Sequence, residues 1–138
     1  MRLKNEIEYA FRILLYLTKN GEDRIVSSNE ISEKEDIPHL FSLRILKKLE
    51  KADLVVIFKG ARGGYRLKRD GREITLKDAI ESIEGKICLK DCMESPESCA
   101  LRGGNCGIHR VMKSIEDDFV KRLEAVNFRD LADGNINN

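Results

Sequence analysis

Four cysteines lie close together in the second half of the 138-residue sequence. They are Cys88, Cys92, Cys99 and Cys106, separated by three, six and six residues. The surrounding segment, 86–107, has no hydrophobic period and contains Pro96, so we expect it to be a loop. Thiols in such a loop are better placed to bind a metal or cluster, or to form a disulfide, than to fill a core.

Three chemistries compete for these thiols. Structural zinc usually takes four nitrogen or sulfur ligands arranged in close Cys-x-x-Cys pairs, and this spacing contains no such pair. A disulfide switch is compatible with the proximity of the cysteines, although the sequence specifies no pair. An iron–sulfur cluster needs thiolates that converge from a loop, and it tolerates a ligand other than cysteine. The spacing alone leaves the cluster and zinc both open.

The N-terminal half is expected to form three helices. Residues 3–17 repeat apolar residues at helical spacing, and the pair Ser27 and Glu30 has the sequence of a capping box that begins a short helix over 28–34. Pro38 then suits the first turn of a third helix. On this third helix one line is apolar and another is basic. The apolar line is Leu40, Leu43, Leu46 and Leu49.

A β-hairpin is expected to follow the basic helix. The β-branched run 54–58 and the shorter run 65–68 flank a glycine-rich turn over 59–64. The order of helix, short helix, turn, basic helix and hairpin is typical of a winged helix-turn-helix. We therefore predict a mainly α fold with a small β-hairpin wing, in the α+β class.

The C-terminal half is expected to contain two more helices. Thr75 and Asp78 begin a short one that Gly85 ends. A longer one spans 108–126, with a narrow apolar seam suited to a partner helix. That seam is Ile108, Met112, Ile115, Phe119, Leu123 and Val126. The predicted division is a DNA-binding domain over 1–84, a cysteine loop over 85–107, and a dimerisation helix with a frayed tail over 108–138.

Charge is distributed unevenly along the chain. The net charge is +1, yet residues 37–72 hold 10 basic and 3 acidic residues, which indicates a surface for a polyanion. Ser42 and Arg44 are predicted at early exposed positions that could meet base edges, while Lys47 and Lys48 would meet phosphate. The predicted DNA-binding residues are Ser27, Ser42, Arg44, Lys47, Lys48, Lys59, Gly60 and Arg62.

Several other classes of protein are disfavoured. No apolar run approaches the roughly 20 residues that a membrane span needs, and the charged N-terminus is unlike a signal peptide, so we expect a cytoplasmic protein. The histidines are His39 and His109. Because no third group is evident to orient a Cys106–His109 pair, we do not expect an enzyme.

Motifs along most of the chain resemble one bacterial family. The start Met1-Arg2-Leu3, the pair Tyr9-Ala10, the wing Lys59-Gly60-x-x-Gly63-Gly64-Tyr65 and the pattern Cys92…Cys99…Cys106-x-x-His109 are similar to the IscR/NsrR/RirA regulators over about residues 1–130. The resemblance implies a homodimeric transcription regulator that binds a pseudo-palindromic duplex and senses iron–sulfur, nitric oxide, iron or redox status.

The resemblance also implies the metal ligands. Cys92, Cys99 and Cys106 match the residues that bind a 2Fe-2S or 4Fe-4S cluster, and the fourth ligand would be His109 or Glu8 of the partner subunit. The spacing between cysteines is slightly longer than is common in the family, which leaves the cluster type open. The alternative is a zinc-stabilised or metal-free regulator whose thiols act as a switch.

Overall fold

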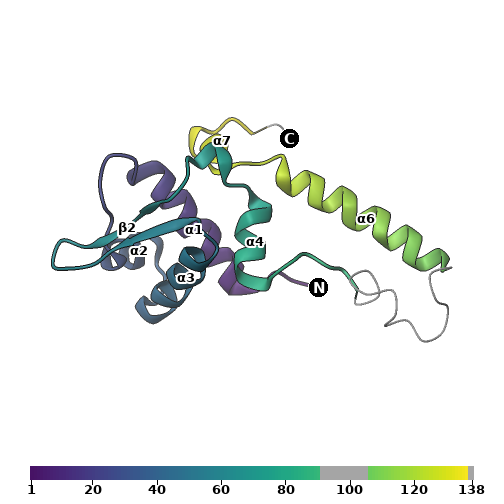
Figure 1. Ribbon diagram of the computed structural model, residues 1–138, viewed down its shortest axis with the longest axis horizontal. Helices are drawn as coiled ribbons and strands as arrows, with labels where there is room; N and C mark the ends of the chain where they lie inside the picture. Colours follow the sequence, from purple (N-terminus) through teal and green to yellow (C-terminus); the bar gives the residue numbers. More distant parts are fainter. Residues whose placement is uncertain (91–105, 137–138) are drawn as a thin grey trace.

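The computed structural model describes residues 1–90 and 106–136 (Figure 1). Within these residues it has six α-helices, a 3-10 turn (η1, Gly71–Glu73) and one two-stranded antiparallel sheet. The helices are α1 (Asn5–Asn20), α2 (Ser28–Glu35), α3 (His39–Lys51), α4 (Leu76–Glu84), α6 (Gly107–Glu124) and α7 (Phe128–Asp133), and the strands are β1 (Val55–Phe58) and β2 (Gly64–Leu67). The predicted mainly α fold with a hairpin wing is confirmed.

Helix α1 lies at the centre of the molecule and packs against α3, α4 and α7. Its apolar face is fully buried at Ile13, Leu14 and Leu17, and α3 contributes Leu46 and Leu49 to the same core. Burial of each large aliphatic side chain contributes about 1.5–3 kcal/mol to the free energy of unfolding. This shared core fixes the orientation of α3.

The predicted apolar line of α3 is only half correct. Leu46 and Leu49 are buried, but Leu40 and Leu43 are 77% and 36% exposed. The cause is helical geometry, because a step of three residues falls about 60° short of a full turn, so residues nine apart lie on opposite sides of a helix. The face that enters the core consists of Ser42, Ile45, Leu46 and Leu49.

The prediction that Ser42 is exposed is therefore wrong. Ser42 is fully buried, and its hydroxyl has no hydrogen-bond partner within the described part of the chain. A side chain on this face of α3 cannot reach a base edge while the helix stays packed on α1.

The hairpin is held to the helical core by one further pair of hydrogen bonds. β1 and β2 pair from Val55 with Leu67 to Phe58 with Gly64. Beyond the ladder, Val26 and Tyr65 exchange backbone hydrogen bonds of 2.9 and 2.7 Å. Glycine is required where the backbones meet, because a Cβ atom on Gly64 would lie 2.5 Å from the Val26 carbonyl oxygen. The wing therefore has a fixed base, from which its turn extends away from the core (Figure 1).

The capping box predicted at the start of α2 forms only in part. The Ser27 hydroxyl accepts the Glu30 backbone N–H at 3.1 Å, but the Glu30 side chain does not return to Ser27. Its carboxylate instead accepts two bonds from the Arg24 guanidinium, at 2.8 and 2.6 Å, and one from the Tyr16 hydroxyl. These donors, Arg24 first, lower the pKa of Glu30 from its ordinary 4.5 to about 2. Glu30 thus joins α2 to α1.

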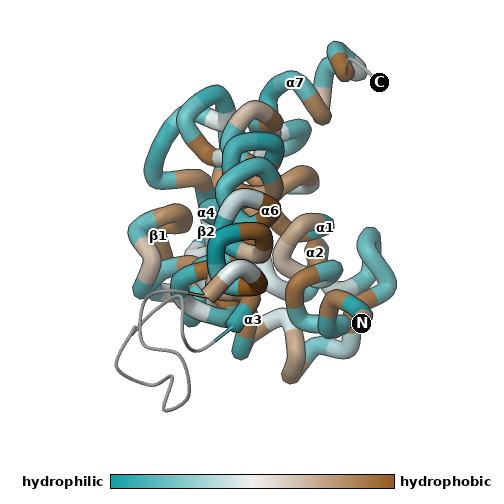
Figure 2. The backbone as a smooth tube through the Cα atoms, turned by 90° about the vertical axis from the view of Figure 1, so that its right-hand side faces the viewer, coloured by the Kyte–Doolittle hydropathy of each residue, from teal (hydrophilic) through white to brown (hydrophobic). Residues whose placement is uncertain are grey.

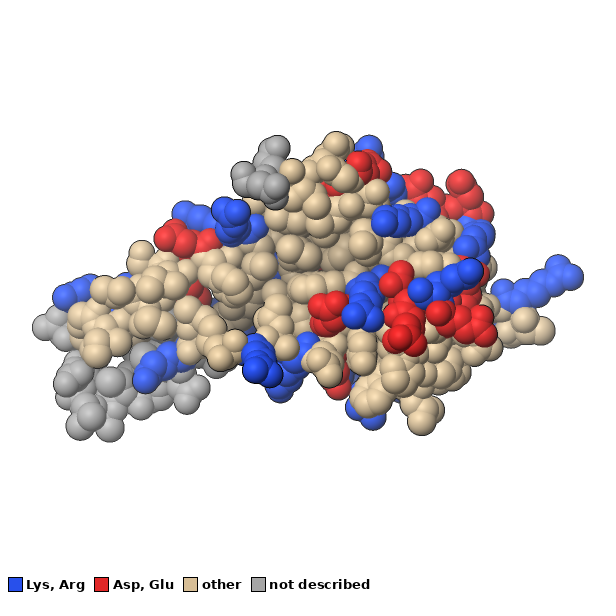
Figure 3. Space-filling view, turned by 180° about the vertical axis from the view of Figure 1, so that it is seen from behind, with Lys and Arg blue, Asp and Glu red and all other residues tan. Residues whose placement is uncertain are grey.

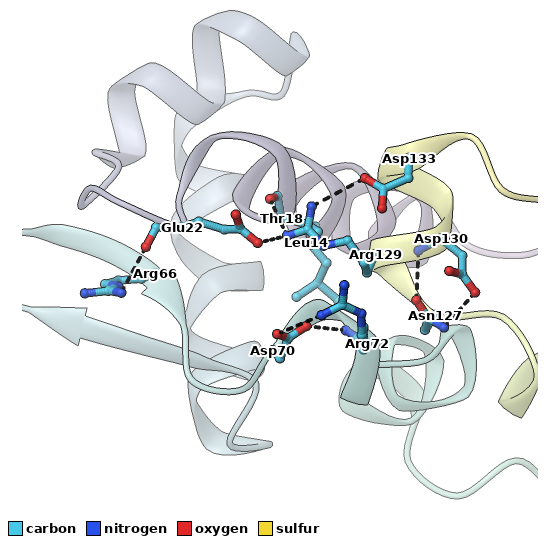
Figure 4. A network of polar contacts seen from close by, with 10 residues as sticks. All are labelled: Leu14, Thr18, Glu22, Arg66, Asp70, Arg72, Asn127, Arg129, Asp130 and Asp133. Atoms are coloured by element: carbon cyan, nitrogen blue, oxygen red, sulfur yellow. Dashed lines mark hydrogen bonds and ion pairs between the residues drawn. The ribbon is translucent and has the colours of Figure 1, made fainter.

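The last helix, α7, was not predicted from the sequence. Asn127 caps it by accepting the Asp130 backbone N–H at 2.8 Å, and Phe128 is buried in the core beside α1. Arg129 reaches the far end of α1, where it donates to the Thr18 carbonyl oxygen and pairs with Glu22 (Figure 4). The chain after α6 therefore returns to the N-terminal core before the residues expected to form a tail.

The two helices predicted in the C-terminal half are both present. Thr75 and Asp78 form a full capping box at the start of α4, and Gly85 follows its last residue with a φ of 80°. The long helix expected over 108–126 is α6, which projects away from the body of the molecule (Figure 1). No described helix has the length and apolar character that a membrane crossing would require.

We predict that Glu30→Gln lowers the free energy of unfolding by about 1–3 kcal/mol at pH 7, because the neutral amide weakens the link to Arg24 and Tyr16. The folded-state pKa is depressed, so this stabilisation is present above about pH 4.5 and is lost as the pH falls toward 2. Urea unfolding at pH 7 and pH 3 measures both effects.

The matched control is Glu33→Gln, an exposed glutamate on the same helix that makes no ion pair with a described residue. It should leave stability unchanged at both pH values. A Glu30→Gln protein as stable as the control at pH 7 would contradict the prediction.

Candidate nucleic-acid interface and cysteine segment

The exposed side of α3 carries its basic residues. Arg44, Lys47 and Lys51 recur at intervals of three and four, and all three are exposed on the side opposite the buried face. In a helix-turn-helix protein, such a face of the second helix enters the major groove. The core packing described above thus presents these cations outward.

Arg44 is held in place by two neighbours. Its guanidinium lies 5.1 Å from the centre of the Phe41 ring and 3.6 Å from the Glu6 carboxylate. The Phe41 ring in turn contacts Tyr9 of α1, with 6.2 Å between ring centres. Arg44 is still 57% exposed, so this arrangement limits its conformations and leaves its donors available to a ligand.

Lys48 differs from the other basic residues of this helix. Its ammonium group donates to Glu6 of α1 at 2.9 Å, and this bond is the largest cause of the lowered Glu6 pKa. Lys47 is exposed and makes no ion pair within the described residues. A phosphate contact is therefore directly open to Lys47, whereas Lys48 would first have to leave Glu6. The DNA-binding role of each lysine stays a prediction.

The wing supplies a second exposed basic segment. Lys59 and Arg62 are exposed in the turn between the strands, and Gly60 adopts a φ of 106° that a side chain would strain. In Figure 3 positive side chains extend from the end of the molecule where this turn lies. Ser27 is exposed too, although its hydroxyl is already occupied by the Glu30 N–H.

The structure describes the cysteine segment, residues 86–107, only at its two ends. Cys92 and Cys99 lie outside the described residues. Cys106 is the N-cap of α6, and its carbonyl oxygen accepts the Arg110 N–H at 3.1 Å. His109 follows three residues later, and both residues are half-buried. Residues three apart share a face at the start of a helix, so the thiol and the imidazole come from neighbouring positions.

Glu8 and Cys88 have partners of their own. Glu8 is exposed on α1 and forms an ion pair with Arg12 at 3.1 Å. The Cys88 thiol is half-buried and donates to the Lys90 carbonyl oxygen at 2.9 Å. Within the described residues of one chain, no group of three or more His, Cys, Asp or Glu side chains is arranged to hold a metal. The structure therefore does not bring Glu8 together with Cys106 and His109 in a single chain.

A buried carboxylate fixes the entry to the cysteine segment, and the sequence analysis missed it. Glu116 of α6 is only 4% exposed and accepts the Leu89 backbone N–H at 2.9 Å and the Lys113 ammonium at 3.0 Å. These two donors, the amide first, lower the pKa of Glu116. A signal was available, because Glu116 follows Met112 by four residues and so continues the side of α6 that faces the body.

The basic α3 and the hairpin on a shared helical core define a winged helix-turn-helix protein. The model of the Rrf2 family, described as an iron-dependent transcriptional regulator, matches residues 3–134, so the chain belongs to that family. The family resemblance read from the sequence is confirmed. Transcription regulation through DNA binding is the function of this class.

Individual relatives agree with this assignment. The chain is 32% identical to protein aau3 of Rhizobium meliloti over 131 residues, which cover 95% of this chain and 84% of that protein. It is 26% identical to the transcriptional regulator NsrR of Oceanobacillus iheyensis, over 95% of this chain and 89% of that protein. The solved structure of CymR, the global cysteine regulator of B. subtilis, is similar in fold, with a TM-score of 0.79, 22% identity and coverage of 96% and 97%.

We predict that Lys47→Ala weakens binding to duplex DNA of any sequence, because it removes a phosphate contact. The slope of log K against log salt concentration should fall by about 1. Fluorescence anisotropy with a mixed-sequence duplex, recorded at several salt concentrations, measures both changes.

Two controls accompany this measurement. Lys121→Ala removes an exposed lysine of α6, and Ser42→Ala changes a side chain inside the core. Both should leave the slope unchanged. An equal loss of slope in Lys47→Ala and Lys121→Ala would show that the α3 face has no special role.

Proposed function

We propose that this regulator holds an iron–sulfur cluster with Cys92, Cys99 and Cys106 and changes its DNA binding with the state of that cluster. The observation that carries the proposal is the placement of Cys106 and His109 together at the start of α6, the helix that leads back to the DNA-binding core. Thiolates are the usual ligands of such clusters and histidine replaces cysteine in some, so this donor set fits. The cluster would supply a group sensitive to oxidants, nitric oxide or iron scarcity.

Two residues compete for the fourth ligand position. His109 is one helical turn from Cys106 in the same chain, which favours it on proximity. Glu8 of the partner subunit is the other candidate, and it would have to release Arg12 to serve. A ligand that also has a competing partner binds more weakly, a property suited to a site that must lose its cluster in response to a signal.

The contacts of α6 suggest how the cysteine segment acts on the DNA-binding core. Glu116 holds the entry to the segment through the Leu89 N–H, and Glu124 at the other end of α6 pairs with Lys77 of α4 at 3.0 Å. A displacement of Cys106 at the first turn of α6 would strain both contacts. Helix α4 packs on α1 and α3, so the displacement would alter the placement of the basic face.

The apolar stripe on α6 supports a homodimer. Ile108, Val111, Ile115 and Phe119 are between 42% and 62% exposed and recur at intervals of three and four residues. Hydrophobic residues recur along α6 in Figure 2, and the half of the molecule that carries α6 has broad areas without charge in Figure 3. The same stripe on a second copy would cover it. Two winged helices could then meet half-sites about one DNA turn apart on a pseudo-palindrome.

We predict that protein purified without oxygen is brown and contains iron and sulfide in near-equal amounts, and that Cys99→Ala abolishes both. Cys88→Ala is the matched control, because Cys88 lies outside the three-cysteine motif, and it should keep the cluster. Visible absorption with iron, sulfide and zinc analysis of the same samples measures the outcome. A Cys99→Ala protein with full iron and sulfide would contradict the ligand assignment.

The same samples test the alternative reading. Colourless protein with stoichiometric zinc would favour a structural metal. Colourless protein without metal, even after reconstitution with iron and sulfide, would favour a thiol switch. The similarity in fold to a cysteine regulator makes this second outcome a defined rival.

We predict that Ile115→Glu converts the dimer to a monomer, because a carboxylate would be buried in the apolar contact between two α6 helices. The control is Ser114→Glu, an exposed neighbour that points about 100° away around the helix axis. Sedimentation velocity distinguishes the two states. A dimeric Ile115→Glu protein, or a monomeric wild type, would place the contact elsewhere or remove it.

A further inference from the structure

Two leucines project from the first turns of α3 into solvent. Leu40 is 77% exposed and Leu43 is 36% exposed, so neither supports the core. Each lies four residues before a basic residue, Leu40 before Arg44 and Leu43 before Lys47, and therefore shares the basic face of the helix. This face combines apolar and cationic groups.

A single exposed leucine is ordinary on a protein surface. These two leucines, however, lie in the part of the helix that contacts bases in helix-turn-helix proteins. In helix-turn-helix proteins the N-terminal residues of the second helix contact base edges, while more distant basic residues contact the backbone. Leu40 and Leu43 are at that N-terminal end, and Lys47 and Lys51 follow them. Burying both leucines against a ligand would remove apolar surface from water.

The positive charge of the segment that contains α3 and the wing favours a polyanion as the ligand. Residues 37–72 carry 10 basic and 3 acidic residues, and Lys59 and Arg62 in the turn of the wing are exposed. If the ligand were an apolar protein surface, these cations would have no negatively charged partner. The major groove offers both chemistries, since phosphates line its edges and the 5-methyl groups of thymine form its apolar contacts.

We propose that Leu40 and Leu43 read thymine 5-methyl groups in the major groove. The proposal rests on the DNA-binding interface described above and specifies what that interface recognises. Each operator half-site is then expected to carry T·A pairs, with thymine on either strand, at the positions that face the first turns of α3. Arg44, fixed by Phe41 and Glu6, contacts a neighbouring base pair or phosphate.

The size of the effect follows from the burial of one methyl group. Removing a methyl from a well-packed apolar contact weakens binding about three- to fivefold. Deoxyuridine makes this change alone, because it lacks the methyl group and keeps every hydrogen-bonding group of thymine. The two leucines are exposed, so alanine at either position leaves the core intact.

The experiment uses the 138-residue protein purified without oxygen. Selection from a pool of random-sequence duplexes defines the half-site, and each thymine in it is then replaced in turn by deoxyuridine. Anisotropy titrations compare wild type with Leu40→Ala, Leu43→Ala and Lys47→Ala. Wild type should lose affinity about three- to fivefold at one or two positions in each half-site.

The variants assign the effect to particular side chains. At a position read by Leu40, Leu40→Ala should bind the thymine and uracil duplexes equally, while Lys47→Ala should bind both more weakly and keep the wild-type ratio. Enrichment of a half-site without any uracil effect, or a uracil effect that persists in both leucine variants, would overturn this inference and leave the DNA-binding assignment standing. Failure to enrich any duplex would overturn both.

Discussion

The burial of α1 against α3 is the contact on which the rest of the structure depends. The two helices share a fully buried core, and Ile13 and Leu17 of α1 and Leu49 of α3 are among its largest side chains. Once that face of α3 is inside, helical geometry turns Arg44 and Lys47 outward. The position of the proposed DNA-reading surface is therefore a consequence of how apolar residues pack on its reverse side.

Ion pairs add to the contacts by which core packing orients the N-terminal helices. Glu6 of α1 holds Lys48 and approaches Arg44, so one carboxylate restricts two of the cations on α3. Glu30 of α2 likewise pairs with Arg24, which lies in the segment that joins α1 to α2. Both carboxylates have lowered pKa values because their partners are cations, with the Tyr16 hydroxyl adding to the effect at Glu30. Part of the basic charge of the N-terminal half thus maintains the architecture, and the remainder is available to DNA.

Local signals made much of this fold predictable. The caps at Ser27 and Thr75, the glycines of the wing and the periodicity of α6 all act over a few residues, and each predicted an element that is present. The orientation of α3 was harder to predict, because its leucine line winds around the helix and tertiary packing decides which part of that line is buried. Prediction of the candidate site was limited in the same way. Neither the pairing of Lys48 with Glu6 nor the burial of Glu116 can be predicted from residue spacing along one helix.

The return of α7 to the core has a consequence for biosynthesis. Phe128 packs beside α1, the first helix of the chain, and Arg129 binds at the end of that helix. A chain emerging from the ribosome cannot complete its DNA-binding core until residue 128 has followed, by which point the cysteine segment and α6 have already been made. The order of translation therefore delays completion of the DNA-binding core until the whole of α6 has been synthesised.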